Sequence, residues 1–254
     1  MLDSHFHPDH WGVYPFIHIG SFILSSYTLF VSLGLLVGIL VFYLEARKEK
    51  IDNDRTFFIA IAAIVGGILG AKIMVWILYF PLISKNFTNY VLILSGRTIV
   101  GGFLGGMLAV FLTKKTLKIK GKRGNMFAPA IALGLAIGRI GCFLQGCCYG
   151  IATTLPWGVN FGDGVRRHPT QLYESLFWLI MFFYLQRKKK DNPKPGKLFQ
   201  LLLVDYFIFR FFLEFIKFEP KVVWNLTIYQ IIAIIALVYL LRNEIVSLWR
   251  KLHR

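Results

Sequence analysis

Residues 21–44 read SFILSSYTLFVSLGLLVGILVFYL, a mainly apolar stretch of 24 residues without a charged side chain. About 20 helical residues are enough to cross the hydrocarbon core of a bilayer. Six further apolar stretches follow, at residues 56–80, 98–113, 126–144, 172–186, 198–216 and 225–241. The pattern predicts an all-α polytopic membrane protein with seven transmembrane helices, built as a single integral-membrane domain over residues 1–254.

The composition excludes the common soluble classes. Hydrophobic residues make up 56% of the chain and charged residues 17%, whereas soluble domains average about 45–50% apolar and about 25% charged residues. The same figures exclude disordered chains and disulfide scaffolds. The formal net charge of +16 comes without a basic-aromatic binding module, so no nucleic-acid partner is expected.

The positive charge is distributed unevenly between the two sides of the predicted membrane. Four segments on one side hold 20 Lys and Arg residues: 45–55, 114–125, 187–197 and the C-terminal tail. The connections on the other side hold only five. Because Lys and Arg accumulate in cytoplasmic loops, this bias predicts an N-terminus outside the membrane and a C-terminus in the cytoplasm.

Several ionisable residues fall at membrane depth or at a span boundary. They are Lys72, Arg97, Arg139 and Arg210, with Glu174, Asp205 and Glu214. Such groups are costly in hydrocarbon and usually face a bundle interior or a wet cavity. Arg210 and Glu214, four residues apart, share a helix face and could form a structural ion pair. The excess of cations also fits an anionic ligand such as a lipid phosphate, which arginine binds through two parallel hydrogen bonds.

Four short stretches combine these charges with glycine, tyrosine or histidine. They read GRIGCFLQGCCYG (138–150), RRHPTQLYE (166–174), YFIFRFFLE (206–214) and GRTIVGGFLGG (96–106). Small residues along a helix allow close approach of a second backbone or of a ligand. Arginines at the ends of a glycine-rich bundle therefore indicate a site for a phospholipid headgroup.

The three cysteines, Cys142, Cys147 and Cys148, fit neither a zinc site nor a thioredoxin-like motif. They could serve as small apolar residues in a tightly packed helix end. A Cys142–Cys147 disulfide near an oxidising outer face is the alternative.

The motifs GRIG (138–141) and RHPTQLYE (167–174), together with Tyr27 and the Tyr206, Arg210, Glu214 spacing, resemble the bacterial phosphatidylglycerol–prolipoprotein diacylglyceryl transferase family. The resemblance runs in the same order over nearly the whole chain. It implies a multi-pass transferase of the bacterial cell (inner) membrane that moves the diacylglyceryl group of phosphatidylglycerol onto the lipobox cysteine of a preprolipoprotein. A thioether forms and glycerol 1-phosphate leaves. No metal ion and no cofactor is expected.

The resemblance also implies the site residues. Catalytic roles fall to Arg139 and Arg210, and substrate contacts to Arg139, Tyr27, Tyr206, Arg97, Gly101, Gly102, Glu174, Glu214 and Gln171. His168 is added as a catalytic residue because it is the best base at the outer end of the fifth span.

The chain departs from the family pattern at three positions. Val100 stands where many members carry a histidine that is a candidate base, and valine cannot take a proton. Cys142 and Cys147 replace an asparagine and a glutamate. Substitute bases are His168, Glu174 and Asp205. A divergent paralogue acting on another anionic lipid or acceptor, and a transporter of an anionic solute, remain alternative interpretations.

The charge bias predicts the result of reporter fusions. Reporters placed after Glu49, Lys120, Lys190 and the C-terminus should be cytoplasmic, and those near Lys85, Asp163 and Lys221 should be outside, because the Lys- and Arg-rich connections stay in the cytoplasm. Paired phosphatase and fluorescent-protein fusions measure this. An even number of crossings would contradict the seven-span topology.

Overall fold

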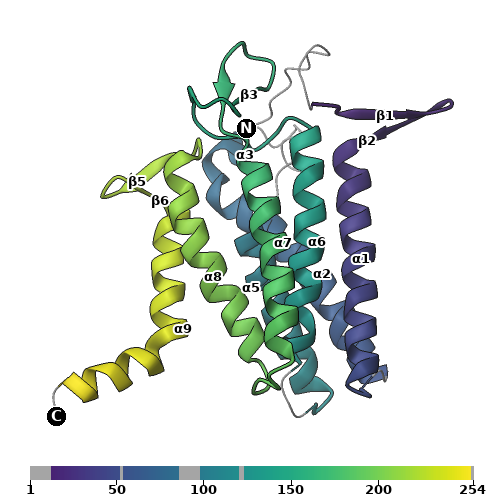
Figure 1. Cartoon of the computed structure of the whole chain (residues 1–254), viewed down its shortest axis with the longest axis vertical. Coiled ribbons are helices and arrows are strands. Elements are labelled where there is room, and N and C mark those ends of the chain that lie inside the picture. Colours follow the sequence, from purple (N-terminus) through teal and green to yellow (C-terminus); the bar gives the residue numbers. More distant parts are fainter. Residues whose placement is uncertain (1–12, 52–53, 86–97, 120–122, 253–254) are drawn as a thin grey trace. The chain divides into compact units, whose positions relative to one another are not determined.

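The computed structural model describes residues 13–51, 54–85, 98–119 and 123–252. Each of the seven predicted apolar stretches coincides with a long helix in this part of the chain (Figure 1). The helices are α1 (Ser26–Lys48), α2 (Asp54–Leu78), α5 (Ile99–Thr116), α6 (Gly124–Leu144), α7 (Thr170–Lys189), α8 (Lys197–Leu213) and α9 (Ile228–Leu252). Among the described residues, two short helices accompany them, α3 (Phe80–Lys85) and η1 (Glu214–Ile216).

The helices have the apolar character of a multi-pass membrane protein. Within the described ranges, α1, α2, α5 and α6 are long and apolar enough to cross a bilayer, and Ile228–Arg242 forms a shorter apolar helix. The prediction of seven long helices is therefore confirmed. Seven crossings, and the side on which each terminus lies, stay predictions.

Three short β-hairpins were not expected from the apolar pattern. They pair β1 (Phe16–Ile19) with β2 (Phe22–Ser25), β3 (Val159–Asn160) with β4 (Arg166–Arg167), and β5 (Lys221–Val223) with β6 (Leu226–Thr227). The first hairpin takes up residues 21–25 of the first predicted span. Its two-residue turn uses the positive φ of Gly20 (+62°), a conformation that glycine adopts at no steric cost.

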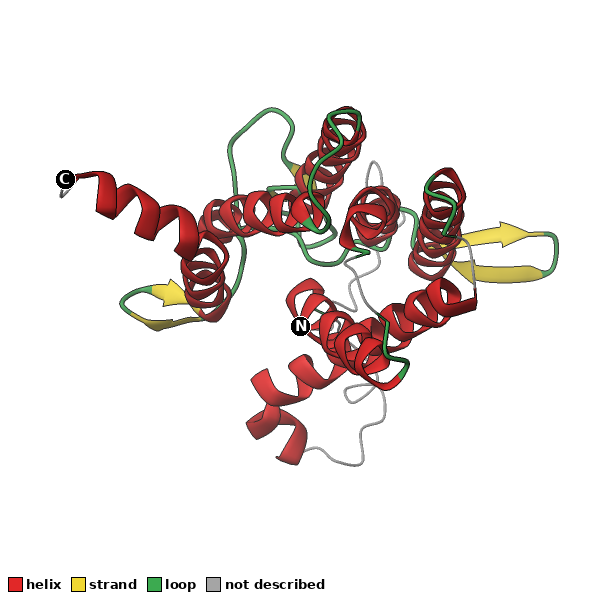
Figure 2. Ribbon diagram, turned by 90° about the horizontal axis from the view of Figure 1, so that it is seen from below, coloured by secondary structure: helices red, strands yellow, loops and turns green. Residues whose placement is uncertain are grey.

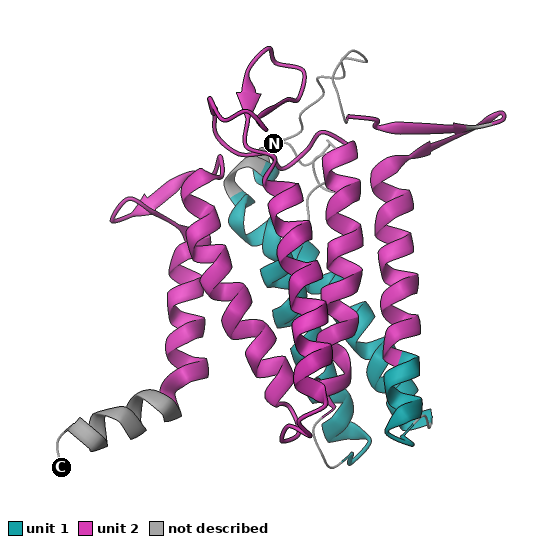
Figure 3. Cartoon of the chain, in the orientation of Figure 1, with its two compact units in different colours: residues 1–2, 43–121 teal, residues 3–42, 122–254 magenta. Residues whose placement is uncertain are grey.

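The described chain forms two compact units (Figure 3). Unit 1 comprises residues 1–2 and 43–121, and unit 2 comprises residues 3–42 and 122–254. Unit 1 contains α2, α3 and α5. Unit 2 contains most of α1, the helices α6 to α9 and all three hairpins.

Unit 1 is held together by direct contact between the backbones of α2 and α5. A Cβ atom added to Gly70 of α2 would lie 2.6 Å from the Cα of Gly105 on α5, and one added to Gly101 would meet the Gly70 carbonyl oxygen and the Met74 side chain. Real Cβ atoms do not approach other atoms so closely. The glycines of 66–70 and 101–105 therefore set the distance between these helices, as the sequence indicates for small residues on a helix face.

Unit 2 combines one glycine contact with an aromatic core. A Cβ on Gly134 of α6 would lie 2.8 Å from the Gly34 carbonyl oxygen on α1. On the other side, the fully buried Trp178 of α7 stacks on Tyr206 of α8, with ring centroids 5.0 Å apart. This stacking fixes α8 against α7, and both helices carry charged residues of the candidate site.

All three hairpins lie toward one end of the unit 2 helices (Figure 1), and Figure 2 shows β1–β2 and β5–β6 projecting from opposite sides of these helices. The same end receives the C-termini of α6 and α8 and the N-terminus of α7. The basic connection from α7 to α8 lies at the opposite end. Three helix ends therefore meet where the motifs 138–150, 166–174 and 206–214 converge.

The α2–α5 contact predicts different outcomes for two alanine substitutions on one helix. Gly70→Ala places a methyl group inside the partner backbone, and such overpacking costs about 1–3 kcal/mol. Gly67→Ala is the matched control, because its Cβ would lie 3.6 Å from the nearest atom, the Gly102 carbonyl oxygen, which is ordinary van der Waals contact. Thermal unfolding in detergent should show a lower Tm for Gly70→Ala only. Equal Tm values for both variants would contradict the backbone contact.

Candidate functional site

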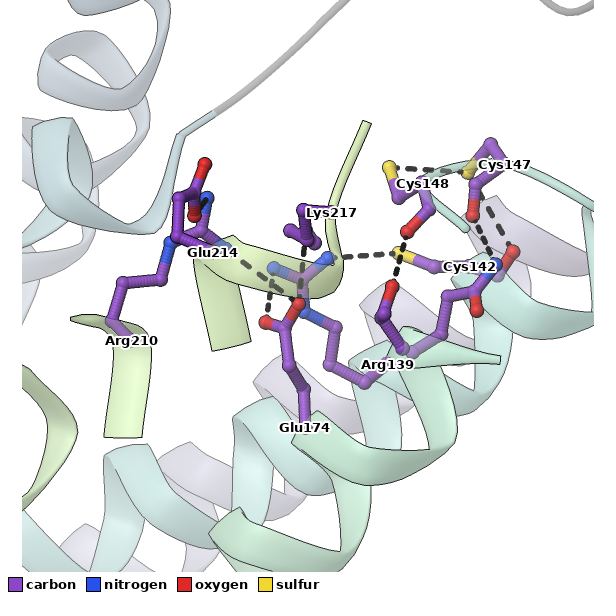
Figure 4. A network of polar contacts seen from close by, with 10 residues as sticks. Arg139, Cys142, Cys147, Cys148, Glu174, Arg210, Glu214 and Lys217 are labelled. Carbon is purple, nitrogen blue, oxygen red and sulfur yellow. Dashed lines mark hydrogen bonds and ion pairs between the residues drawn. The ribbon is translucent and has the colours of Figure 1, made fainter. Parts of the chain in front are cut away.

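Five charged side chains converge at the hairpin end of unit 2 (Figure 4). They are Arg139 of α6, Glu174 of α7, Arg210 of α8, Glu214 of η1, and Lys217, which follows η1. We call these five residues the charge cluster. It contains three cations and two carboxylates, so its formal charge is positive.

Glu174 is the centre of the charge cluster. Its Oε2 lies 2.5 Å from Arg139 Nη2. Its Oε1 lies 3.1 Å from Lys217 Nζ and 3.7 Å from Arg210 Nη1. The Glu174 side chain is only 1% exposed, and a charge buried this deeply is tolerated only when it is paired. One carboxylate therefore holds cations from three segments of the chain.

Arg210 has two further partners. Its Nη2 lies 2.9 Å from Glu214 Oε2, and its guanidinium carbon lies 4.7 Å from the centre of the Tyr229 ring. The i,i+4 ion pair considered from the sequence is thus present. This ion pair does not use all the hydrogen-bond donors of Arg210. The Nε atoms of Arg210 and Arg139 are buried and make no hydrogen bond within the described residues. Both arginines keep a donor for another anion.

The cysteines lie in a loop whose shape follows from the end of α6. The Cys147 N–H donates to the Cys142 carbonyl oxygen at 3.1 Å and the Gly146 N–H to that of Phe143 at 2.9 Å, with Gly146 at φ +71°. This is the Schellman motif, in which the residue after the glycine packs on the residue five positions earlier. It places Cys147 against Cys142. In the described structure all three cysteines are free thiols.

The start of α7 holds this loop beside the charge cluster. Thr170 Oγ1 donates to the Cys148 carbonyl oxygen at 2.8 Å, and Gln171 Nε2 donates to that of Cys147. Arg139 Nη1 contacts Cys142 Sγ at 3.8 Å. The loop and the charge cluster therefore share Arg139 and the first turn of α7. The buried Gln171 Oε1 makes no hydrogen bond within the described residues.

Comparisons with known proteins identify the family. A model of the family described as prolipoprotein diacylglyceryl transferase matches residues 15–242. The chain is 34% identical over 208 residues to the phosphatidylglycerol–prolipoprotein diacylglyceryl transferase of Clostridium tetani, which covers 77% of this chain and 82% of the relative. The enzyme of the same name from Finegoldia magna is 33% identical over 215 residues, or 82% of this chain and 85% of the relative.

This chain belongs to the prolipoprotein diacylglyceryl transferase family. Membership confirms the family that the motifs resemble and makes the protein a transferase. It contradicts the alternative of an anionic-solute transporter.

The structure brings several of the predicted site residues of this diacylglyceryl transferase together. Arg139, Glu174, Arg210 and Glu214 belong to the charge cluster, and Gln171 holds the adjacent loop. Arg97 lies outside the described residues. Gly101 and Gly102 lie on α5 of unit 1, where Gly101 contacts α2.

The predicted tyrosines belong to unit 2. Tyr206 is 1% exposed and lies one turn before Arg210 on α8. Tyr27 is half-buried on α1, and its carbonyl oxygen would lie 3.3 Å from a Cβ added to Gly141 of α6. Both tyrosines therefore pack on helices that contribute to the charge cluster.

His168, a predicted catalytic residue, lies just before α7 and contacts Tyr173 of that helix. Its Nδ1 lies 3.2 Å from the Tyr173 hydroxyl oxygen, and no described contact joins its ring to the charge cluster. Its side chain does not cap α7, because the N-cap is Pro169 and no side-chain hydrogen bond closes that end. Its backbone instead pairs with Gly150 and Ile151.

Lys217 is the member of the charge cluster that the sequence analysis missed, since it was counted only as part of a connection. The spacing of Lys217 from Arg210 and Glu214 could have placed it in the charge cluster. Positions 210, 214 and 217 follow the i, i+4, i+7 pattern of one helical face, and η1 follows α8 without a break.

The geometry predicts the effect of neutralising the central carboxylate. Glu174→Gln leaves three buried cations with one carboxylate, and breaking a buried ion pair in this way costs about 3–5 kcal/mol. Thermal unfolding in detergent should show a clear loss of stability. The matched control is Asp191→Asn, which removes a carboxylate that is 69% exposed and 3.7 Å from Lys188. Exposed pairs contribute about 0–1 kcal/mol, so equal losses in both variants would contradict the central role of Glu174.

Proposed function

We propose that this protein transfers the diacylglyceryl group of phosphatidylglycerol to the lipobox cysteine in the signal peptide of a preprolipoprotein. The observation that carries the proposal is the charge cluster, in which three cations surround two carboxylates, and two arginine Nε donors make no hydrogen bond to any described residue. Such a site matches a phosphate that must be bound in a largely apolar bundle. The names of the relatives supply the donor lipid and the acceptor protein.

The reaction is a displacement at a glycerol carbon. The acceptor sulfur forms a C–S bond, the C–O bond to the phosphate breaks, and the phosphate oxygen keeps the bonding electrons as glycerol 1-phosphate leaves. Because a thiolate is the nucleophile, the acceptor must lose its proton. Negative charge grows on the leaving phosphate, and fixed cations aimed at that position lower the barrier.

The described residues divide this work between them. Arg139 and Arg210 bind the phosphate through the N–H groups that face away from the carboxylates. Glu174 and Glu214 hold the two guanidinium groups in place. The resemblance to the family also implies substrate contacts for Tyr27, Tyr206, Arg97, Gly101, Gly102 and Gln171.

We extend the proposal to the whole molecule. The match to the family model runs through residues of both units, which supports one transferase domain. The 20-to-5 distribution of Lys and Arg supports seven crossings of the bacterial cell (inner) membrane with the N-terminus outside. The charge cluster would then lie toward the outer side.

Complementation tests the activity. The gene should restore lipoprotein modification in cells depleted of their own transferase, measured as the mass shift of a reporter lipoprotein. Purified protein should also modify a lipobox peptide in vesicles of phosphatidylglycerol. Transfer only from another anionic lipid, such as cardiolipin, would favour the divergent paralogue instead.

Arginine substitutions test the phosphate site. Arg139→Ala and Arg210→Ala should each lower the transfer rate by about 10²–10³, the usual effect of removing one donor to a developing oxyanion. Arg210→Lys should lie between wild type and Arg210→Ala, because a point charge does not reproduce the planar fork of a guanidinium. The assay is transfer to the lipobox peptide, with protein amount and monodispersity checked in detergent.

The matched control is Arg187→Lys, at an exposed position at the other end of α7, which should keep the wild-type rate. Full activity of Arg210→Lys would indicate that Arg210 serves only to pair with Glu214.

A further inference from the structure

We propose that Tyr229 is a positioning residue of the transferase, whose ring holds the Arg210 guanidinium where the phosphate of the donor lipid binds. The inference rests on the proposed function, in which Arg210 binds that phosphate. Tyr229 lies in the first turn of α9, a helix that contributes no charged residue to the charge cluster. This helix therefore reaches the charge cluster through an aromatic ring.

The contact between Tyr229 and Arg210 is buried on both sides. The guanidinium carbon of Arg210 lies over the Tyr229 ring, 4.7 Å from its centre. Tyr229 is 7% exposed and Arg210 is 6% exposed. A cation within about 6 Å of the centre of an aromatic ring is attracted by the negative charge of the ring face, and the attraction is stronger where water is excluded. The ring therefore stabilises Arg210 in this position from the side of α9.

A capping box fixes the first turn of α9 and, with it, Tyr229. The Thr227 N–H donates to Gln230 Oε1 at 2.9 Å, and the Gln230 N–H donates to Thr227 Oγ1 at 3.3 Å, which satisfies two backbone donors at the helix start. Gln230 Nε2 also donates to the Phe211 carbonyl oxygen of α8 at 3.3 Å. Phe211 directly follows Arg210 in the chain. Because Gln230 directly follows Tyr229, this hydrogen bond joins the two helices at the contact.

The β5–β6 hairpin sets the residue at which α9 begins. Its two-residue turn consists of Trp224 and Asn225, whose φ angles are +47° and +60°. Positive φ at both central residues is what a type I′ hairpin turn requires. The hairpin ends at Thr227, the first residue of the capping box. The chain that leaves α8 therefore reaches Tyr229 through a hydrogen-bonded hairpin.

The ring holds Arg210 without using one of its N–H groups. Glu214 Oε2 lies 2.9 Å from Arg210 Nη2, and Glu174 Oε1 lies 3.7 Å from Arg210 Nη1. These carboxylates attract the cation, but they also compete with an incoming phosphate for its donors. The neutral ring does neither, and the buried Nε makes no hydrogen bond within the described residues. Tyr229 therefore orients Arg210 before the lipid binds, which lowers the cost of ordering the site.

A second pair of the same kind on α9 provides a matched control. The guanidinium carbon of Arg242 lies 4.5 Å from the centre of the Tyr239 ring. The two distances are similar, but Tyr239 is 63% exposed and Arg242 is exposed as well. Tyr239 also lies almost three helical turns after Tyr229, away from the charge cluster. Tyr239→Leu therefore removes a ring over an arginine without touching Arg210.

Transfer kinetics test the role of Tyr229. The assay uses a lipobox peptide and vesicles in which the fraction of phosphatidylglycerol is varied. Tyr229→Leu should lower kcat/KM for the lipid by about 10-fold, which corresponds to about 1.4 kcal/mol and is a smaller loss than that of Arg210→Ala, because the cation remains but is less well oriented. Tyr229→Phe keeps the ring face and should stay within about twofold of wild type. Tyr239→Leu should match wild type.

A double-mutant cycle shows whether Tyr229 acts through Arg210. In an Arg210→Ala background the guanidinium is absent, so the addition of Tyr229→Leu should cause no further loss of kcat/KM. A residue that only fills space would cause the same loss in both backgrounds, as independent sites do.

A series of fluorinated rings gives a second measurement should Tyr229→Leu fail to fold. Incorporation of phenylalanine, difluorophenylalanine or trifluorophenylalanine at position 229 keeps the shape of the ring and progressively removes negative charge from its face. If the ring face holds Arg210, kcat/KM should fall step by step along the series. Protein amount and monodispersity in detergent are measured for every variant.

Four results would overturn the inference while the proposed function stands. They are wild-type kinetics for Tyr229→Leu, an equal loss for Tyr229→Phe and Tyr229→Leu, an equal loss from Tyr229→Leu with and without Arg210, and a rate that does not depend on fluorination. The second would assign the effect to the hydroxyl group, and the third would make Tyr229 a packing residue. Absence of transfer by the wild-type protein at every fraction of phosphatidylglycerol would instead refute the proposed function, and the inference with it.

Discussion

Glu174 is 1% exposed and lies within 3.7 Å of nitrogen atoms from Arg139, Arg210 and Lys217. These cations come from α6, from α8 and from the segment after η1, and without the carboxylate they would repel one another in an apolar bundle. Because a carboxylate has only two oxygens, it can fix the positions of three cations without saturating their N–H groups. The remaining donors are the ones that we propose bind the phosphate of the donor lipid.

The ends of the helices place the cluster in this position. The α6 helix closes with a Schellman motif that turns the cysteine loop back over its own last turn. The α7 helix begins with Thr170 and Gln171, whose side chains bind the carbonyl oxygens of that loop. Arg210 lies in the last turn of α8, where the partial negative charge of the helix end favours a cation. The Schellman motif of α6, the first side chains of α7 and the last turn of α8 belong to different segments. Together these helix ends form the polar charge cluster within an apolar protein.

The sequence contains enough information for the helices and for most of the charged residues. Long apolar stretches predict helices because no other structure satisfies the backbone in a bilayer, and buried arginines point to a site because they are costly. Other features depend on geometry that spacing does not reveal. The contact between Cys142 and Cys147 requires the positive φ of Gly146. Lys217 enters the cluster only because η1 prolongs α8. The hairpins are too short to give a clear alternating pattern.

The contact between α2 and α5 has a mechanical consequence. Where Gly70 meets Gly105, backbone touches backbone without side chains in between. Helices that interlock through side chains can shift by exchanging rotamers, but glycines have none to exchange. Any displacement of α2 along α5 must break many van der Waals contacts at once. The energy of the unit therefore rises steeply with such a displacement, and no intermediate packing exists. Within unit 1, α2 and α5 should therefore move together as one rigid body.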